Sequence, residues 1–103
     1  MAEITVVKES NARGGRYVAR VAGIADEAEL TFTQRGPALV SADHTGAPDS
    51  LKGTGAARAL VDFMIADARK NNFKIKPVCP YVRALYAKNP DWQDVMTTPP
   101  DKK

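Results

Sequence analysis

Two glycines separated by one residue stand at the head of the longest helical pattern in the chain, in the run Lys52-Gly53-Thr54-Gly55-Ala56. Glycine inside a helix costs about 0.5–1 kcal/mol relative to alanine, so the pair needs a physical reason. A helix start presents unpaired backbone N–H groups and the positive end of the helix dipole, and both attract phosphate. The missing side chains would admit an anion, and Lys52 adds positive charge. The spacing fits equally well a turn in which the glycines serve only the backbone, because it is neither a P-loop nor a complete G-x-G-x-x-G.

Cys79 and His44 are the only cysteine and the only histidine, and either could act in catalysis. Cys79 ends an apolar segment, where a cysteine is either an acyl-accepting nucleophile or a small buried hydrophobe. No His or Lys adjacent to it in the sequence would activate its thiol. His44 follows a strand-like segment and is either a general base, since imidazole titrates near neutral pH, or a structural hydrogen-bonding residue. Both interpretations of each residue stay open on the sequence alone.

The composition is that of one ordinary folded domain. A length of 103 residues suits a single core, which we place at residues 1–97, and the composition of residues 98–103 predicts a disordered tail. The net charge of +3 comes from scattered basic residues without aromatic interleaving, which argues against a nucleic-acid surface. No apolar run approaches the roughly 20 residues of a membrane span, and the N-terminus does not resemble a signal peptide. The lone cysteine favours a reducing compartment, so we expect a cytoplasmic protein with no membrane partner and no metal site.

Four segments in the first half alternate in polarity or carry β-branched residues, as expected for strands. Turn residues separate them, among them Gly14-Gly15 and Gly36-Pro37. The alternation places Tyr17, Ala19 and Val21 on one face. Connections of hairpin length predict an antiparallel meander. The predicted strand ranges are 4–8, 16–23, 28–35 and 38–44.

The hydrophobic period changes from two to 3.6 residues after Gly53. A helix is predicted from Gly53 to about Asn71, and at 1.5 Å per residue it is long enough to cover a small sheet. A fifth strand follows at residues 73–79 and a second helix at residues 81–88, with Pro80 in its first turn. The predicted class is α+β, a mainly antiparallel sheet of about five strands with two helices in the order ββββ-α-β-α. The apolar stripe of the first helix comprises Ala56, Ala57, Leu60, Val61, Met64, Ile65 and Ala68.

Two motifs at matching spacing resemble a known family. The first is HTGAPDSLKGTG, from His44 to Gly55, and the second is KPVCPYV at residues 76–82, followed by Asn89-Pro90. Together they resemble the compact single-domain branch of the GNAT N-acetyltransferase superfamily, which carries His-Thr, Leu-Arg-Gly-x-Gly, Pro-x-Cys-x-Tyr-Val and His-Pro. The resemblance is close from residue 44 onwards and covers the first four strands only by pattern.

The resemblance implies acetyl-CoA as the cofactor and a place for each of its parts. In the family, the glycine-flanked helix start binds the pyrophosphate through backbone amides. The pantetheine arm would lie between the segments that end at His44 and Cys79. Tyr86 resembles the tyrosine that larger relatives use as a general acid, although an amphipathic core tyrosine fits as well. The residues that match the pyrophosphate motif are Lys52, Gly53, Thr54, Gly55 and Ala56.

Several positions depart from the family pattern. Lys52 replaces the usual arginine, which keeps the charge but loses the bidentate fork. Gly46 stands where the branch often has glutamate, and this removes one candidate general base. Ser50 replaces a glutamine or arginine, Asn89 replaces the histidine of His-Pro, and Leu85 stands where the branch tends to have tyrosine. These changes affect the catalytic assignments more than cofactor binding.

We therefore predict an N-acetyltransferase that binds acetyl-CoA and transfers the acetyl group to an amine by direct attack. Its candidate catalytic residues are Cys79, His44 and Tyr86. The expected second substrate is an amine acceptor, either a small molecule or a protein. One alternative is a CoA-binding module with little or no transferase activity, which the missing carboxylate at Gly46 favours. A less favoured alternative, from another class, is a small basic nucleic-acid adaptor.

Overall fold

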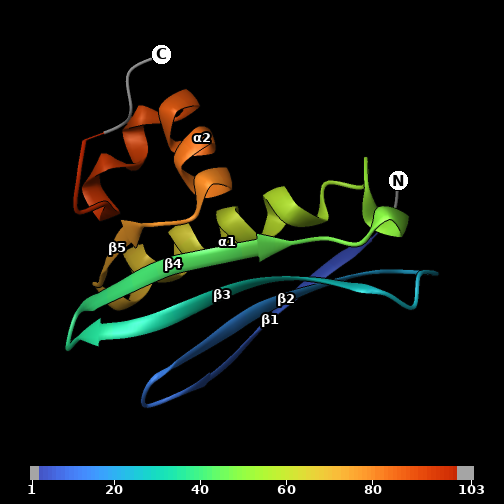
Figure 1. The fold of residues 1–103 in the computed structure, drawn as a ribbon, viewed down its shortest axis with the longest axis horizontal. Helices are drawn as coiled ribbons and strands as arrows, with labels where there is room; N and C mark the ends of the chain where they lie inside the picture. Colours follow the sequence, from blue (N-terminus) through green and yellow to red (C-terminus); the bar gives the residue numbers. More distant parts are fainter. Residues whose placement is uncertain (1–2, 100–103) are drawn as a thin grey trace.

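The computed structural model describes residues 3–99, in which five strands form one sheet in the order β1-β2-β3-β4-β5. The helices α1 (Ala56–Asn71) and α2 (Pro80–Lys88) pack on one face of this sheet (Figure 1). The strands are β1 (Ile4–Asn11), β2 (Gly14–Val21), β3 (Glu27–Gly36), β4 (Leu39–Gly46) and β5 (Lys74–Pro77), and two 3-10 segments are η1 (Asp49–Leu51) and η2 (Pro90–Val95). The predicted α+β class and element order are confirmed. Of the predicted tail, residues 100–103 lie outside the described part.

Strands β1 to β4 form the predicted antiparallel meander, and β5 adds to it in the parallel direction. A parallel neighbour needs a crossover connection, because a tight turn can only reverse the chain. Helix α1 is that crossover, and it brings Lys74 beside Leu39 and Pro77 beside Ala42. The end of β4 and the end of β5 therefore lie at the same edge of the sheet, next to the loop that enters α1.

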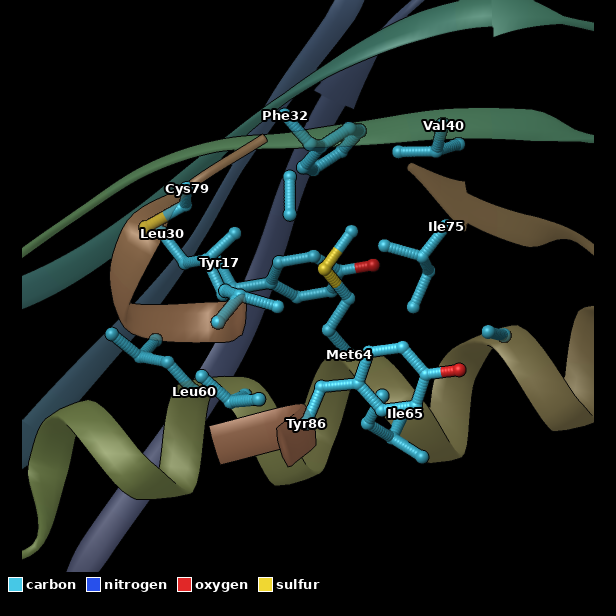
Figure 2. Close-up of a cluster of buried hydrophobic side chains, with 14 of the residues drawn as sticks. Tyr17, Leu30, Phe32, Val40, Leu60, Met64, Ile65, Ile75, Cys79 and Tyr86 are labelled. Atoms are coloured by element: carbon cyan, nitrogen blue, oxygen red, sulfur yellow. The ribbon is translucent and has the colours of Figure 1, made fainter. Parts of the chain in front are cut away.

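The core lies between the sheet and the two helices (Figure 2). Strand alternation sends Tyr17, Ala19 and Val21 of β2 into it, as predicted, and Leu30 and Phe32 of β3 beside them. The apolar stripe of α1 covers these residues, with six of its seven predicted members buried: Ala56, Leu60, Val61, Met64, Ile65 and Ala68. Within residues 3–99, no helix is long and apolar enough to cross a membrane.

Helix α1 ends where the sequence indicates, at Asn71-Asn72. Asn72 adopts the left-handed conformation, with φ of 57°, and its N–H bonds to the carbonyl of Ala68. Asparagine tolerates this conformation better than most residues, so it closes the helix at little cost. Helix α2 starts with Pro80 at its first position, as the sequence predicts.

No helix within residues 3–99 covers the other face of the sheet, which carries charged side chains instead. Arg16 Nη1 lies 2.8 Å from Glu29 Oε1, Arg16 Nε lies 2.9 Å from Glu9 Oε1, and Arg20 Nη2 lies 3.1 Å from Glu27 Oε2. Charged residues can cover apolar surface with their aliphatic stems while the heads stay in water. Val18, which lies among them on this face, is fully buried.

Candidate functional site

Gly53 and Gly55 lie in the loop that leads into α1 rather than inside the helix. Their φ angles are 78° and 87°, in the left-handed region that costs other residues about 1–2 kcal/mol. Gly55 is the N-cap and the helix begins at Ala56, later than the predicted start at Gly53, because the two glycines first turn the chain. A Cβ placed on Gly53 would meet no atom within 4 Å, so the space above the loop is open.

The hydroxyl of Thr54 holds the loop together from within. It donates to the carbonyl of Leu51 at 2.6 Å and accepts the N–H of Ala56 at 3.2 Å. The Thr54 N–H also bonds to Leu51, at 3.2 Å, and the Lys52 N–H bonds to Asp49 at 3.1 Å. Three of the five predicted cofactor-binding residues thus have their amides occupied by long hydrogen bonds within the chain.

Four N–H groups around the start of α1 have no acceptor among the described residues, and they belong to Gly53, Gly55, Ala57 and Arg58. Ala57 and Arg58 lie in the first turn of α1, where N–H groups point out along the axis and form the positive end of the helix dipole, and the two glycines directly precede that turn. Such a set of unpaired donors suits an anion such as a phosphate. Sequence reasoning found the two glycines but missed Ala57 and Arg58, which a helix start at Ala56 would have indicated.

Polar contacts anchor the loop to the sheet. Ser50 Oγ donates to Asp26 Oδ2 at 2.7 Å, which ties η1 to the turn between β2 and β3, and the Leu51 side chain is buried. Lys52 Nζ lies 3.1 Å from Asp49 Oδ1, with both side chains largely exposed. An exposed pair of this kind is worth at most about 1 kcal/mol, so Lys52 is available to another anion.

A β-bulge at Asp43 shapes the neighbouring end of β4. Thr31 pairs with His44 but Phe32 pairs with Ala42, so Asp43 is an extra residue in β4. Its carboxylate accepts hydrogen bonds from Thr33 and, at 2.6 Å, from Ser41. The extra residue bends the strand.

Beyond Ala42, β4 has no strand partner on its β5 side among residues 3–99. The ladder ends where the N–H groups of Val78 and Cys79 both donate to the carbonyl of Ala42, at 3.2 and 2.8 Å. The chain then turns away into α2, while β4 continues to Gly46. An unpaired strand edge offers backbone donors and acceptors to an extended ligand.

Cys79 lies beside this edge and is buried. It is the N-cap of α2, and its Sγ lies 3.3 Å from Thr45 Oγ1, with either atom able to donate. Thr45 faces the helices because the bulge places it opposite Leu30, a core residue. The thiol therefore has a neutral hydroxyl as its side-chain partner, at the point where β4 and β5 separate.

The structure does not bring His44 or Tyr86 to this thiol. His44 pairs with Thr31 and is exposed on the face of the sheet that carries no helix. The Tyr86 ring is in the core, and its hydroxyl donates to the carbonyl of Thr98 at 2.7 Å. Figure 2 shows that hydroxyl pointing away from Cys79. Burial raises the pKa of Tyr86, so the hydroxyl stays protonated and able to donate.

Tyr81 lies near the candidate site, and the sequence assigned it no role. Burial raises the pKa of its hydroxyl, the charge of Arg58 opposes this, and Asp62 and Cys79 add to it. Tyr81 thus lies within electrostatic range of the first turn of α1 and of the thiol, and its ring is partly exposed. Its position after Cys79, in the first turn of α2, is the signal that could have identified it.

The chain matches the sequence model of a protein family and is similar to a human protein. The sequence model of the GCN5-related N-acetyl-transferase family matches residues 16–95, which include β2 from Arg16 onwards, β3 to β5, both helices and the glycine loop. Protein NATD1 from Homo sapiens is 27% identical over 82 residues, which cover 80% of this chain and 73% of that protein.

Proposed function

Because the chain belongs to the GCN5-related N-acetyl-transferase family, we propose that it binds acetyl-CoA and transfers the acetyl group to an amine. The observation that carries the proposal is that the N–H groups of Gly53, Gly55, Ala57 and Arg58, and the neighbouring edge of β4, have no partner within residues 3–99. The pyrophosphate of acetyl-CoA needs N–H donors that are not already bonded within the protein. Its pantetheine arm, which contains amide groups, can pair with an unpaired strand edge. The two requirements meet at one end of the sheet.

The fit to the cofactor rests on space as well as on donors. No atom lies within 4 Å of the position that a Cβ on Gly53 would take, and only Ile4 Cδ1, at 3.9 Å, would meet one on Gly55. The positive φ of both residues holds their peptide groups in an orientation that other residues adopt only at a cost. The glycines therefore serve the turn and the anion together.

When bound, acetyl-CoA would supply an activated acyl group as a thioester. The chain's own residues would hold the pyrophosphate at residues 53–58 and the arm along β4 after Ala42. The hydroxyl of Thr45 and the thiol of Cys79 would then lie near the reacting end as hydrogen-bond donors. The shared hydrogen bond of 3.3 Å supports this pairing.

Acetyl transfer occurs by direct attack of the amine in this proposal. A nucleophilic cysteine needs a base or a positive charge to form its thiolate. Cys79 is buried against Thr45, and His44 lies on the opposite face of the sheet. A general base must lie within hydrogen-bond reach of the attacking amine, so this proposal assigns that role to no residue on the face opposite the helices, His44 included.

Thermal denaturation with and without acetyl-CoA tests the binding step. At 100 times its Kd a ligand adds about 2.7 kcal/mol to stability, which for a domain of this size raises Tm by roughly 10–20 °C. Transfer is then measured as CoA thiol release with a panel of polyamines, amino acids and peptide amines. The absence of any shift at millimolar acetyl-CoA would refute the proposal.

A CoA-binding module without transferase activity is the second candidate. Gly46 supplies no carboxylate, the Tyr86 hydroxyl is bonded to Thr98, and Cys79 has a neutral partner. These observations leave few groups to move a proton. A large thermal shift with both CoA and acetyl-CoA, together with no thiol release from any amine in the panel, would favour this candidate.

A further inference from the structure

Strand β1 forms one outer edge of the sheet, remote in sequence from the glycine loop. It pairs with β2 without interruption, from Ile4 opposite Val21 to Asn11 opposite Gly14. Within residues 3–99 no segment pairs with its other side. An exposed strand edge is a template for pairing with another chain, and proteins that stay monomeric usually protect such edges.

The direction of the free backbone groups follows from one hydrogen bond. The carbonyl of Glu3 accepts the N–H of Ala22 at 2.9 Å, so Glu3 faces β2. Backbone groups alternate along a strand, and the peptide groups of Ile4, Val6, Lys8 and Ser10 therefore face outwards. The strand contains no proline and no bulge that would interrupt this row.

The two charges of β1 are both neutralised inside the chain. Lys8 Nζ lies 2.7 Å from Asp67 Oδ2, and Glu9 Oε1 lies 2.9 Å from Arg16 Nε. Neither side chain is left free to repel an approaching strand, which is how edge lysines normally act. Three rings also hold the Lys8 ammonium, at 5.4–5.7 Å from their centroids: Tyr17, Phe32 and Phe73.

Exposed apolar side chains flank the same edge on both faces. Among residues 3–99 the large hydrophobic side chains that are exposed are Val7, Phe63, Val78 and Tyr81. Val78 and Tyr81 flank Cys79, whereas Val7 lies on β1. Phe63 lies one turn before Asp67, on the side of α1 that meets β1, and it lines a cavity of about 220 Å³.

We infer that two copies of this chain pair through β1 as antiparallel strands, in a register centred on Val7, to form one continuous sheet. The two copies would be related by a two-fold axis perpendicular to the sheet. Such an axis maps each face of the sheet onto the same face, so the helices of both copies would lie on the same side. The occupant is a second copy because the strand is complementary to itself in this register. Val7 meets Val7, Thr5 meets Glu9, and Lys8 meets Val6.

Neighbouring registers are worse. Centring the pair on Lys8 would set the two ammonium groups opposite each other, and like charges directly opposite are destabilising. Centring it on Val6 would set the exposed Val7 side chains against Thr5. The register on Val7 brings together the apolar surface that each copy exposes at this edge, beside Val18 of β2, which is paired with Val7.

Sedimentation equilibrium of the full chain tests the association. We expect a dimer that dissociates on dilution and a Val7→Lys variant whose dissociation constant is raised by at least about tenfold, because two lysines then face each other at the axis. Val78→Lys is the matched control, since Val78 is 46% exposed and Val7 is 45% exposed. We expect this control to associate as the unmodified chain does. A monomer at every concentration, or a dimer that Val7→Lys does not weaken, would overturn the inference.

Disulfide crosslinking tests the register independently of any loss of folding. The N–H and C=O of Val7 point towards β2, so the two Val7 residues at the two-fold axis would form a non-hydrogen-bonded pair. The Cα atoms of such a pair are about 4.5 Å apart, which is within the range that a disulfide can bridge. We expect Val7→Cys to form a covalent dimer under mild oxidation. Thr5→Cys should not, because Thr5 faces Glu9 rather than itself. Equal crosslinking of both variants, or none of Val7→Cys, would contradict this register.

Discussion

Replacement of Gly55 by aspartate and by asparagine separates the two functions of the glycine loop. Gly55 has φ of 87° and ψ of 7°, a conformation that asparagine and aspartate adopt more readily than other side chains. A Cβ there would make only an ordinary contact, 3.9 Å from Ile4 Cδ1. Both variants should therefore fold, with a loss of about 1 kcal/mol from the backbone. They differ only in charge.

The charge should decide cofactor affinity. A carboxylate about 5 Å from two phosphate charges is repelled by roughly 2–6 kcal/mol, depending on how far water screens the site. We therefore expect Gly55→Asp to weaken acetyl-CoA binding by at least about 30-fold relative to Gly55→Asn. Added salt should narrow the difference, because the site is at the surface.

Isothermal titration with acetyl-CoA measures the two affinities, and thermal denaturation measures the backbone cost. Gly23→Asp is the matched control, because Gly23 has φ of 86° and no atom within 4 Å of its Cβ position. It lies in the turn between β2 and β3, so it adds the same charge and strain outside the helix start. Equal affinities for Gly55→Asp and Gly55→Asn would refute the assignment of the pyrophosphate to this loop.

Three further variants test individual side chains. Tyr86→Phe loses the hydrogen bond to Thr98 and should cost about 0.5–1.5 kcal/mol by urea denaturation, with turnover retained; a 100-fold fall in kcat would instead indicate a general acid. Burial alone would raise the pKa of Asp67, but hydrogen bonds led by that of Lys8 hold this pKa below its usual value. The ionised carboxylate therefore stabilises the fold above about pH 4, and this contribution is lost as the pH falls through the folded-state pKa. Asp67→Asn should be less stable than the unmodified chain at pH 7 and should lose less stability on acidification; parallel pH profiles would contradict this. Cys79→Ala should keep most of its turnover, and an acetyl adduct on Cys79 by intact mass would establish a covalent route instead.

The core could be predicted from the sequence because burial imposes a period. Tyr17, Ala19 and Val21 alternate with residues that lie on the other face of the sheet, which are charged except for Val18, and only the first set meets the helices. In α1 the stripe that includes Leu60 and Met64 repeats every three or four residues for the same reason. These patterns report which face of a helix or strand is buried, and they do not determine the residue at which that helix or strand begins.

The start of α1 and the orientation of His44 depend on contacts that no local period encodes. The helix begins at Ala56 because the Thr54 hydroxyl accepts the N–H of Ala56 and the two glycines turn the loop before it. Simple alternation from Ala42 would turn His44 towards the helices. The bulge at Asp43, which a hydrogen bond from Thr33 on β3 fixes, shifts the alternation by one residue. As a result Thr45 faces the helices and His44 faces the other side of the sheet.

The parallel pairing of β4 with β5 has a consequence for the order in which the molecule closes and opens. Strands β1 to β4 each pair with their neighbour in sequence, so their hairpins can close early, whereas β5 must wait until α1 is laid across the sheet. Of the five strands in the described part of the chain, β5 is the shortest, with four residues. The glycine loop and Cys79 thus belong to the segments that join the fold after the meander has formed, and partial opening of the fold should involve them. A ligand that contacts both the glycine loop and the edge of β4 would therefore stabilise the whole crossover from β4 through α1 to β5 against opening.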